Sequence, residues 1–362
     1  MTSPPTRADS AGPETVRGAA TVRGRGAGFD PQNRFERLEV LHETPAEEAI
    51  TTTLFRDASR SVISRNRSPD IPFDASLNPY RGCEHGCSYC YARPSHEYLG
   101  LSAGLDFESK ILVKDDAPEL LRRELTAPRW RAQTLAMSGV TDAYQPIEKR
   151  LGITRGCVEV LAELRHPLAI VTKNALVTRD LDLLQRLAAH QAVSVSISIT
   201  TLDPELSAGM EPRASAPRRR LEAVARLAAA GVPVGVGVAP LVPGLNDHEI
   251  PAILDAAAEA GATFAGFTVL RLPGAVAQIF DDWLERTLPD RRKKILARVR
   301  SMRSGALHDA RFGHRMRGEG FFAEQVAQLF EIARRKHGLA RRGPRPSPDA
   351  FRRPNQQLSI FG

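Results

Sequence analysis

The sequence predicts an α/β protein built around a parallel β-sheet. Six short runs rich in Val, Ile and Leu alternate with stretches whose apolar residues recur at helical spacing. Strands that alternate with helices form parallel sheets, because each helix returns the chain to start the next strand in the same direction. The 362 residues suffice for one large α/β domain with appended segments. No stretch approaches the about 20 apolar residues of a membrane span.

The candidate strands can be placed along the chain in order. They are residues 73–77, 133–137, 168–172, 193–199, 232–238 and 263–270. Residues 181–188 and 221–228 are predicted helices between strands, because their apolar side chains fall on one helical face. Residues 107–113 form either an extra strand or an insertion. After residue 275, apolar residues at helical spacing predict helices that pack on the open side of the sheet.

Three of the four cysteines lie within eight residues, in the run RGCEHGCSYC. Cys83, Cys87 and Cys90 can place three thiolates of one loop around a metal centre, whereas a disulfide would leave one of them over. The fourth cysteine, Cys157, lies in an apolar helical pattern and is predicted to be buried there. A [4Fe-4S] cluster normally takes four thiolates. Three local thiolates therefore leave one iron open, and an open position is where a small molecule can be activated.

A zinc knuckle is the alternative for this loop, because structural zinc takes four ligands and His85 or His96 could supply the fourth. His85 lies between two of the cysteines, so its ring would have to fold back sharply to reach the same ion. His96 could reach zinc, but a knuckle gives no reason for the long series of strands and helices downstream. Neither histidine is assigned a role.

With Tyr89 before the third cysteine, the loop resembles the C-x3-C-φ-C signature of the radical S-adenosylmethionine (SAM) superfamily, in which φ is aromatic. The longer run NPYRGCEHGCSYCYARP resembles the branch related to spore photoproduct lyase, also called DNA-repair-photolyase-like, over residues 70–275. This resemblance implies a partial (βα)6 parallel barrel. It also implies a [4Fe-4S] cluster on Cys83, Cys87 and Cys90, with Tyr89 among the cofactor-binding residues.

The resemblance further implies that SAM chelates the open iron. Reductive cleavage of SAM then releases a 5′-deoxyadenosyl radical that abstracts a hydrogen atom from a substrate. An electron donor such as flavodoxin or ferredoxin is expected as a partner. Spore photoproduct lyase returns a hydrogen atom from a cysteine near the end of the second strand, and SGVTDAYQPIE has none here. Repair by the same route is therefore not predicted, and DNA is one candidate among unidentified substrates.

The remaining cofactor-binding candidates follow the predicted strands, because reacting groups of parallel barrels lie at the carboxyl ends of the strands. Compared with the family, Ser138 and Gly139 occupy the turn that approaches the SAM amino group, although the usual Gly-Gly-Glu triplet is absent. Asp142 is either the missing carboxylate or an ordinary loop residue. Lys173 is expected to pair with the SAM carboxylate. Ser198 is expected to hydrogen-bond the ribose or the methionyl group.

Charge is concentrated near the C-terminus. Residues 334–353 contain eight Lys or Arg and one Asp, so they carry +7 of the net charge of +8. We predict a disordered basic tail over residues 339–362, which either contacts polyanions or is simply solvated. Residues 1–35 are rich in Pro, Gly, Ser, Thr and Arg, lack a secretory signal and are also predicted to be disordered. Between the tails we predict a core domain over 36–275 and a helical extension over 276–338.

The last residues suggest a second partner and an alternative function. Gln357, Leu358, Ser359, Ile360 and Phe361 resemble the pentapeptide with which bacterial proteins bind the sliding clamp. A short apolar peptide after a polar linker suits docking in a hydrophobic groove. The alternative to an enzyme is thus a nucleic-acid or replication-associated binding protein whose cluster or zinc knuckle is structural. Sparse cysteine and the absent export signal predict a reducing cytosol for either function.

Overall fold

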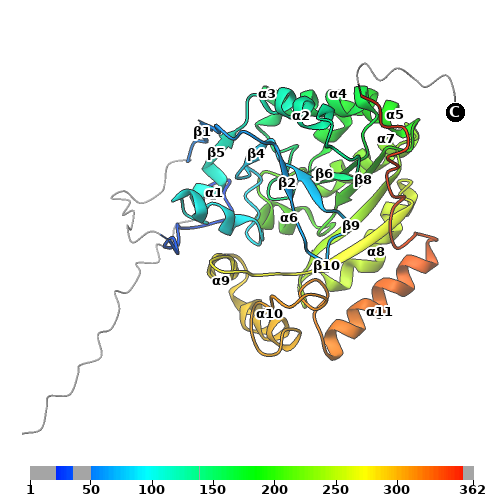
Figure 1. Cartoon of the computed structure of the whole chain (residues 1–362). Helices are drawn as coiled ribbons and strands as arrows, with labels where there is room; N and C mark the ends of the chain where they lie inside the picture. The colour runs from blue at the N-terminus through cyan, green and yellow to red at the C-terminus, as the bar shows by residue number, and fades with distance from the viewer. Residues whose placement is uncertain (1–21, 36–49, 138, 354–362) are drawn as a thin grey trace, which may run out of the picture.

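The computed structural model describes residues 22–35, 50–137 and 139–353. Its centre is a curved sheet with the strand order β10-β9-β8-β7-β6-β3-β2 (Figure 1). Strand β2 (Ile63–Arg65) is antiparallel to β3 at one edge, and the six strands from β3 to β10 are parallel. These six are β3 (Ala75–Leu77), β6 (Leu135–Met137), β7 (Leu168–Thr172), β8 (Val193–Ser198), β9 (Val234–Leu241) and β10 (Phe264–Val269). All six predicted strands are thereby confirmed.

Helices between the strands cover the outer face of the sheet (Figure 1). They are α2 (Ala117–Thr126), α4 (Ile153–Leu164), α5 (Leu181–Ala188), α7 (Pro217–Ala229) and α8 (Ile250–Glu259). Alternate strand residues such as Ile170, Val195 and Val236 point into this layer and are buried in one hydrophobic core. Cys157 is buried in α4, as predicted. No helix within the described ranges is long and apolar enough to cross a membrane.

A small second sheet lies beside the first, and its strand β4 leads directly into the cysteine loop. It orders β1 (Thr53–Arg56), β5 (Lys110–Val113) and β4 (Tyr80–Arg81), with β5 preceded by α1 (Leu105–Ser109). Residues 107–113 therefore do contribute an extra strand. The remaining short helices are α3 (Glu148–Leu151), α6 (Pro204–Met210), η1 (Arg93–Ser95), η2 (Glu97–Leu99), η3 (Ala175–Asp180) and η4 (Asp247–Glu249).

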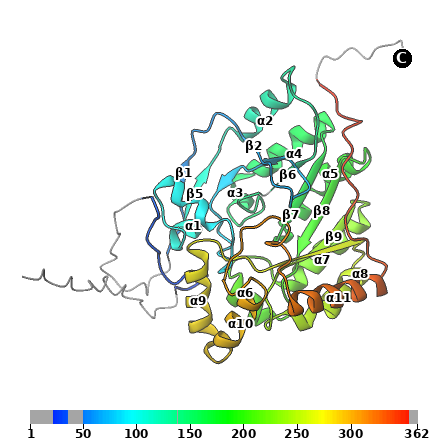
Figure 2. The ribbon, with the colours of Figure 1, turned by 60° about the horizontal axis from the view of Figure 1, so that its bottom comes forward.

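Three further helices follow β10. Helices α9 (Val276–Thr287) and α10 (Pro289–Ser301) pack through Phe280 and Trp283 into a second core, which also contains Cys87 and Tyr89 of the cysteine loop. Helix α11 (Phe321–Lys336) lies along α8 (Figure 2). The C-terminal helices thus support the cysteine loop from one side and the outer helical layer from the other.

The predicted disorder of the basic tail is wrong for residues 339–353, which we call the strap. The strap runs from the end of α11 toward α5, across the amino ends of the parallel strands (Figures 1 and 2). Ala340 pairs with β10 through Ala265 N and Thr263 O, each bond 2.9 Å long. Ser347 N donates to Gln191 O before β8. The free edge of β10 and the open base of the barrel supply partners that composition alone does not reveal.

Candidate functional site

The three predicted ligands lie on one loop after β4. Cys83 and Cys87 are buried, Cys90 is half-buried, and all are free thiols. Two tight turns bring them together, with Gly86 N donating to Cys83 O at 3.3 Å and Cys90 N to Cys87 O at 3.2 Å. Gly86 has a φ of +65°, and a Cβ there would lie 2.6 Å from the Glu108 carboxylate. Only glycine fits this turn without displacing its neighbours.

A buried ion pair holds the loop from behind. Arg93 and Glu108 are both fully buried and in direct contact. Arg93 also donates from Nε and Nη2 to Cys87 O, at 3.0 and 2.8 Å. A buried pair is costly to form, but removing one partner leaves an uncompensated charge. Arg93 therefore fixes the position of the Cys87 backbone.

The N-terminal segment completes this arrangement and corrects a second prediction of disorder. Glu108 accepts hydrogen bonds from Gly26 N at 3.1 Å and Ala27 N at 2.8 Å. Arg25 donates to Glu108 O and Ile50 O, both at 2.6 Å. Residues 22–35 of the predicted 1–35 tail are thus part of the fold, because Glu108 needs donors that the loop alone does not supply. Residues 1–21 lie outside the described residues.

The chemistry of the thiols suits metal ligation better than free reactivity. Burial raises the pKa of Cys83, Cys87 and Cys90. A thiol in such surroundings stays protonated unless a metal stabilises the thiolate. Within the described residues, no three His, Cys, Asp or Glu side chains are grouped to hold a single metal ion. In a cubane each cysteine ligates a different iron, so the three thiols need not converge on one ion.

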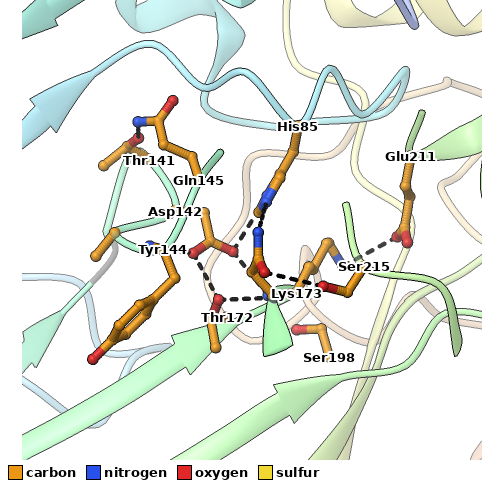
Figure 3. Close-up of polar contacts among 12 residues, drawn as sticks. His85, Thr141, Asp142, Tyr144, Gln145, Thr172, Lys173, Ser198, Glu211 and Ser215 are labelled. Atoms are coloured by element: carbon orange, nitrogen blue, oxygen red, sulfur yellow. Dashed lines mark hydrogen bonds and ion pairs between the residues drawn. The ribbon is translucent and has the colours of Figure 1, made fainter. Parts of the chain in front are cut away.

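Both candidate histidines of the knuckle have other partners. His85 is buried, with Nδ1 3.4 Å from Asp142 Oδ2 and Nε2 3.2 Å from Asn174 Nδ2 (Figure 3). Burial lowers the pKa of His85, and a neutral ring with its proton on Nδ1 satisfies both contacts. His96 is bonded to Lys110 O at 2.9 Å and lies edge-on to Phe107. His85 thus uses both ring nitrogens within the protein, whereas Nδ1 of His96 is buried without a hydrogen-bond partner among the described residues.

Asp142 joins the ends of two strands. It accepts hydrogen bonds from Thr172 Oγ1 at 2.7 Å, Lys173 N at 2.8 Å and Tyr144 N at 2.9 Å (Figure 3). Together with its contact to His85, these bonds place Asp142 between the cysteine loop and β7. It is therefore neither a solvated loop residue nor a free carboxylate at the mouth of the barrel.

Lys173 lies at the mouth within a buried charged network. Its Nζ donates to Ala239 O at 2.8 Å, is 3.3 Å from Glu211 Oε1 and lies 5.6 Å from the centre of the Tyr89 ring. Glu211 also contacts the Tyr89 hydroxyl and Arg220. Burial alone would raise the pKa of Glu211, but Arg220 and Lys173 hold it well below its usual value. The network couples the cysteine loop to the ends of β7, β8 and β9.

The concave face of the sheet offers space beside this network. Ser198 pairs in register with Gly237 of β9, where a Cβ would meet no atom closer than 3.7 Å, whereas the place beside Gly235 nearer the start of β9 is filled by Phe264. Val171 is 45% exposed although it lies in the middle of the parallel sheet. A Cβ added to Gly266 of β10 would meet no atom within 4 Å. The inner face is therefore open where a filled barrel would carry large side chains.

Comparison with known proteins identifies the family. The sequence pattern of the radical SAM superfamily matches residues 77–257, half of the chain. The chain belongs to the radical SAM superfamily. It is accordingly an enzyme of the radical SAM type, a class that uses a [4Fe-4S] cluster and SAM.

Sequence relatives of this radical SAM enzyme occur in bacteria and archaea. An uncharacterized protein of Mycobacterium tuberculosis is 40% identical over 260 residues, which are 70% of this chain and 76% of the relative. An uncharacterized protein of Methanocaldococcus jannaschii is 30% identical over 173 residues, 48% of this chain and 62% of the relative.

Solved structures show the same fold. Spore photoproduct lyase complexed with dinucleoside spore photoproduct superposes with a TM-score of 0.61 at 17% identity, covering 84% of this chain and 87% of that chain. A mutant of that lyase with bound AdoMet and dinucleoside spore photoproduct gives 0.59 at 17% identity, covering 85% and 87%. The partial barrel predicted from the radical SAM resemblance is confirmed.

The structure brings most of the predicted site residues of this radical SAM enzyme to one mouth. Gly139 N donates to Asn78 Oδ1 at 2.9 Å, and Gly139 O accepts from the Tyr91 hydroxyl at 2.9 Å. Lys173 and Tyr89 meet in the charged network described above, and Ser198 O accepts from Arg220 Nη1 at 3.0 Å. Ser138 lies outside the described residues, as do Gln357, Leu358, Ser359, Ile360 and Phe361.

Sequence reasoning missed the partners that organise this mouth. Arg220 is 1% exposed, although it stands in the run RRR that reads as a solvated helix start. The signal for Glu211 was its place after the fourth strand, in MEPRASAPRRR. Arg213, two residues further along, pairs with Glu84 at 3.2 Å. Which arginine joins which carboxylate depends on the packing of α7 against β8.

Proposed function

We propose that this radical SAM enzyme holds its [4Fe-4S] cluster through Cys83, Cys87 and Cys90 and binds SAM at the mouth beside them. The observation that carries this proposal is the loop of three free thiols, two buried and one half-buried, which lies beside polar strand ends. When bound, the reduced cluster and SAM supply a 5′-deoxyadenosyl radical for hydrogen abstraction. An electron donor such as flavodoxin or ferredoxin is proposed to reduce the enzyme.

The protein's own residues shape the SAM site. Arg93 and Glu108 fix the loop, so the three thiols keep their relative positions before any cofactor arrives. Lys173 offers a cation toward the SAM carboxylate, and Glu211 with Ala239 O fixes the position of its Nζ. Gly139 is proposed to let the backbone approach the amino group closely, and any larger residue there would also crowd Ser76, whose Oγ lies 3.1 Å from the position of a Cβ. Ser198, with the glycines of β9, is proposed to line the pocket for the ribose or methionyl group.

We further propose a nucleic acid, with DNA as the first candidate, as the substrate. The support is the shared fold with a lyase that was solved with a dinucleoside photoproduct. Residues 139–148, at the end of β6, contain no cysteine, so a different hydrogen donor would be needed from the one expected in spore photoproduct lyase. A purely structural cluster in a nucleic-acid-binding protein lacks a comparable observation in its favour, because the polar mouth would then have no task.

SAM cleavage by the anaerobically reconstituted, dithionite-reduced protein tests the function. We expect 5′-deoxyadenosine to form. Lys173→Met should weaken SAM binding by on the order of 1.5–3 kcal/mol through loss of a charge-assisted bond, with iron content unchanged. Lys293→Met, on the exposed surface of α10, is the matched control. Unchanged SAM affinity in the Lys173 variant would reassign this lysine to the support of Glu211.

A further inference from the structure

Three cationic side chains at the rim of the mouth have buried nitrogens without a hydrogen-bond partner in the described part of the chain. Arg271 follows β10, Arg303 follows α10, and His308 lies in the next loop. Four of their nitrogens are buried without a hydrogen-bond partner in the described part of the chain: Arg271 Nε, Arg303 Nε, Arg303 Nη1 and His308 Nδ1. Arg303 as a whole is 1% exposed. Buried donors without acceptors are costly, so their concentration at one place calls for a function.

Nearby acidic side chains do not neutralise this group. Asp70 already accepts from Arg315 Nε at 2.5 Å and Gly313 N at 2.7 Å. Asp309 is paired with Arg311 at 2.6 Å. Burial, followed by the charge of Arg271, lowers the pKa of Arg303, and burial, followed by the charge of Arg315, lowers the pKa of Arg271. The site is thus short of negative charge.

A hydrogen bond to the backbone holds Arg303 in position while two of its nitrogens stay unpartnered within the described residues. Arg303 Nη2 donates to Leu270 O at 2.6 Å, which fixes the guanidinium and leaves Nε and Nη1 for another acceptor. Arg271 lies 5.3 Å from the centre of the Tyr91 ring. A planar guanidinium held in this way matches the two oxygens of a phosphate better than a single point charge would.

The group adjoins the proposed reaction centre. Tyr91 directly follows Cys90, is 49% exposed, and bridges to Gly139 at the end of β6. On the loop beyond His308, Phe312 is 57% exposed and lies 4.6 Å from the Arg315 guanidinium. Exposed aromatic rings interleaved with arginines suit bases that stack while their phosphates are bound. SAM carries no phosphate, so a phosphate here would belong to the substrate.

We propose that Arg271, Arg303 and His308 form a phosphate-binding site that positions a nucleotide unit of the substrate against Tyr91. This inference rests on the proposed function, because it assumes that the substrate enters at the same mouth. The phosphate belongs to a phosphodiester of a nucleic acid or to a free nucleotide, and the two sources differ in how tightly each competes for the site.

Fluorescence anisotropy of a labelled single-stranded oligothymidylate tests the site. Arg271→Gln should weaken binding by about tenfold and reduce the slope of log K against log salt by about 0.7. Arg271→Lys should restore part of the affinity. Arg303→Gln should weaken binding as well, and Arg218→Gln is the control, since that side chain is 90% exposed on α7 and has the same charge. Removing Arg271 should leave the melting temperature unchanged or raise it, because the variant relieves repulsion.

Competition identifies the source of the phosphate. Dithymidine monophosphate should displace the probe, and its neutral methylphosphonate analogue should not. If thymidine 5′-monophosphate competes as well as the dinucleotide, the site serves free nucleotides; if it competes less, the site serves a nucleic acid. Equal competition by the methylphosphonate, or wild-type affinity in Arg271→Gln, would overturn the phosphate site.

SAM cleavage without substrate, measured on the same preparations, separates the two proposals. Normal cleavage combined with no nucleotide binding rejects the phosphate site and leaves the radical SAM proposal standing. Nucleotide binding that depends on Arg271, combined with no cleavage, supports the site and rejects the proposed chemistry.

Discussion

The two ends of the barrel, its base and its mouth, differ in how their polar groups are used. At the base, where the parallel strands begin, the strap pairs its backbone with β10 and with the loops before β8 and β7. At the mouth, where the strands end, the three thiols, Lys173, Arg271 and Arg303 lie beside the open inner face of the sheet. The same sheet is thus covered at the base, where the contacts contribute to stability, and open at the mouth, where the side chains contribute chemistry. Sites of this kind are expected to sacrifice local stability for function.

The aromatic packing at the base illustrates the closed edge. Trp130 Nε1 donates to His166 Nε2 at 3.1 Å, and the Phe351 ring of the strap lies edge-on to the same imidazole at 5.3 Å. Arg352 N donates to Leu164 O at 3.0 Å. These groups use one another as partners, whereas at the mouth Arg271 Nε, Arg303 Nε and Arg303 Nη1 have no hydrogen-bond partner among the described residues.

The largest expected effect is at the mouth, on the cysteines. We expect about four irons and four sulfides per chain after anaerobic reconstitution, and Cys83→Ala, Cys87→Ala and Cys90→Ala should each abolish them and with them SAM cleavage. Cys157→Ala is the control, because this thiol is buried in α4 away from the loop. Iron and sulfide assays check this prediction. Loss of the cluster from the Cys157 variant would show that the ligand set is wrong.

Glu211→Gln should produce the next largest effect, on stability. It leaves Arg220, which is 1% exposed, without a carboxylate, and breaking a buried pair costs about 3–5 kcal/mol. The matched control is Glu222→Gln, whose partner Arg218 is exposed, so the cost should stay below about 1 kcal/mol. Urea unfolding measures both. Equal losses would mean that the charged network does not hold the mouth together.

The packing at the base of the barrel should make the unfolding free energy depend on pH through His166. Burial lowers its pKa to about 4, so the fold favours the neutral ring. Its contribution is complete above the usual pKa of about 6.5 and is lost as the pH falls toward 4; between pH 7 and pH 5 the loss is about 2 kcal/mol. His166→Phe should show a correspondingly smaller drop in unfolding free energy between these two pH values. Other buried histidines titrate in both proteins, so an identical drop would exclude His166 as the source.

The sequence predicts the sheet better than the edges of the barrel. Strands such as 168–172 and 193–199 carry their own signal in β-branched runs, and the cysteine spacing carries the loop. Residues 22–35 and 339–353 were predicted to be disordered because Gly, Arg and Pro dominate them. Their order comes from partners remote in sequence, namely the Glu108 carboxylate and the free edge of β10. Local composition does not report such partners.

The same limit applies to the charged residues of the mouth. Lys173 was predictable because it directly follows an apolar strand. Arg303 was not, because it follows a basic helix, α10, whose sequence is typical of a solvated surface. Its burial arises when that helix folds back onto the end of β10, where Leu270 O accepts its hydrogen bond. Contacts between segments about thirty residues apart decide the role of this residue.

The smallest effect on the barrel is expected from the last residues. A peptide of residues 350–362 should bind a bacterial sliding clamp, and replacing both Leu358 and Phe361 with Ala should abolish binding, because the pentapeptide docks by burying apolar area. In the full chain this double variant should leave SAM cleavage and the unfolding free energy unchanged. The described strap ends at Arg353, which donates to Trp130 O at the base. The nine residues that follow Arg353 span at most about 30 Å, so a clamp bound to them would lie on the base side of the barrel and not at the mouth.

Isothermal titration of the peptide with the clamp checks the predicted binding. Absence of binding at millimolar peptide would end the replication link, and lost SAM cleavage in the full-length double variant would show that the C-terminal residues serve the mouth.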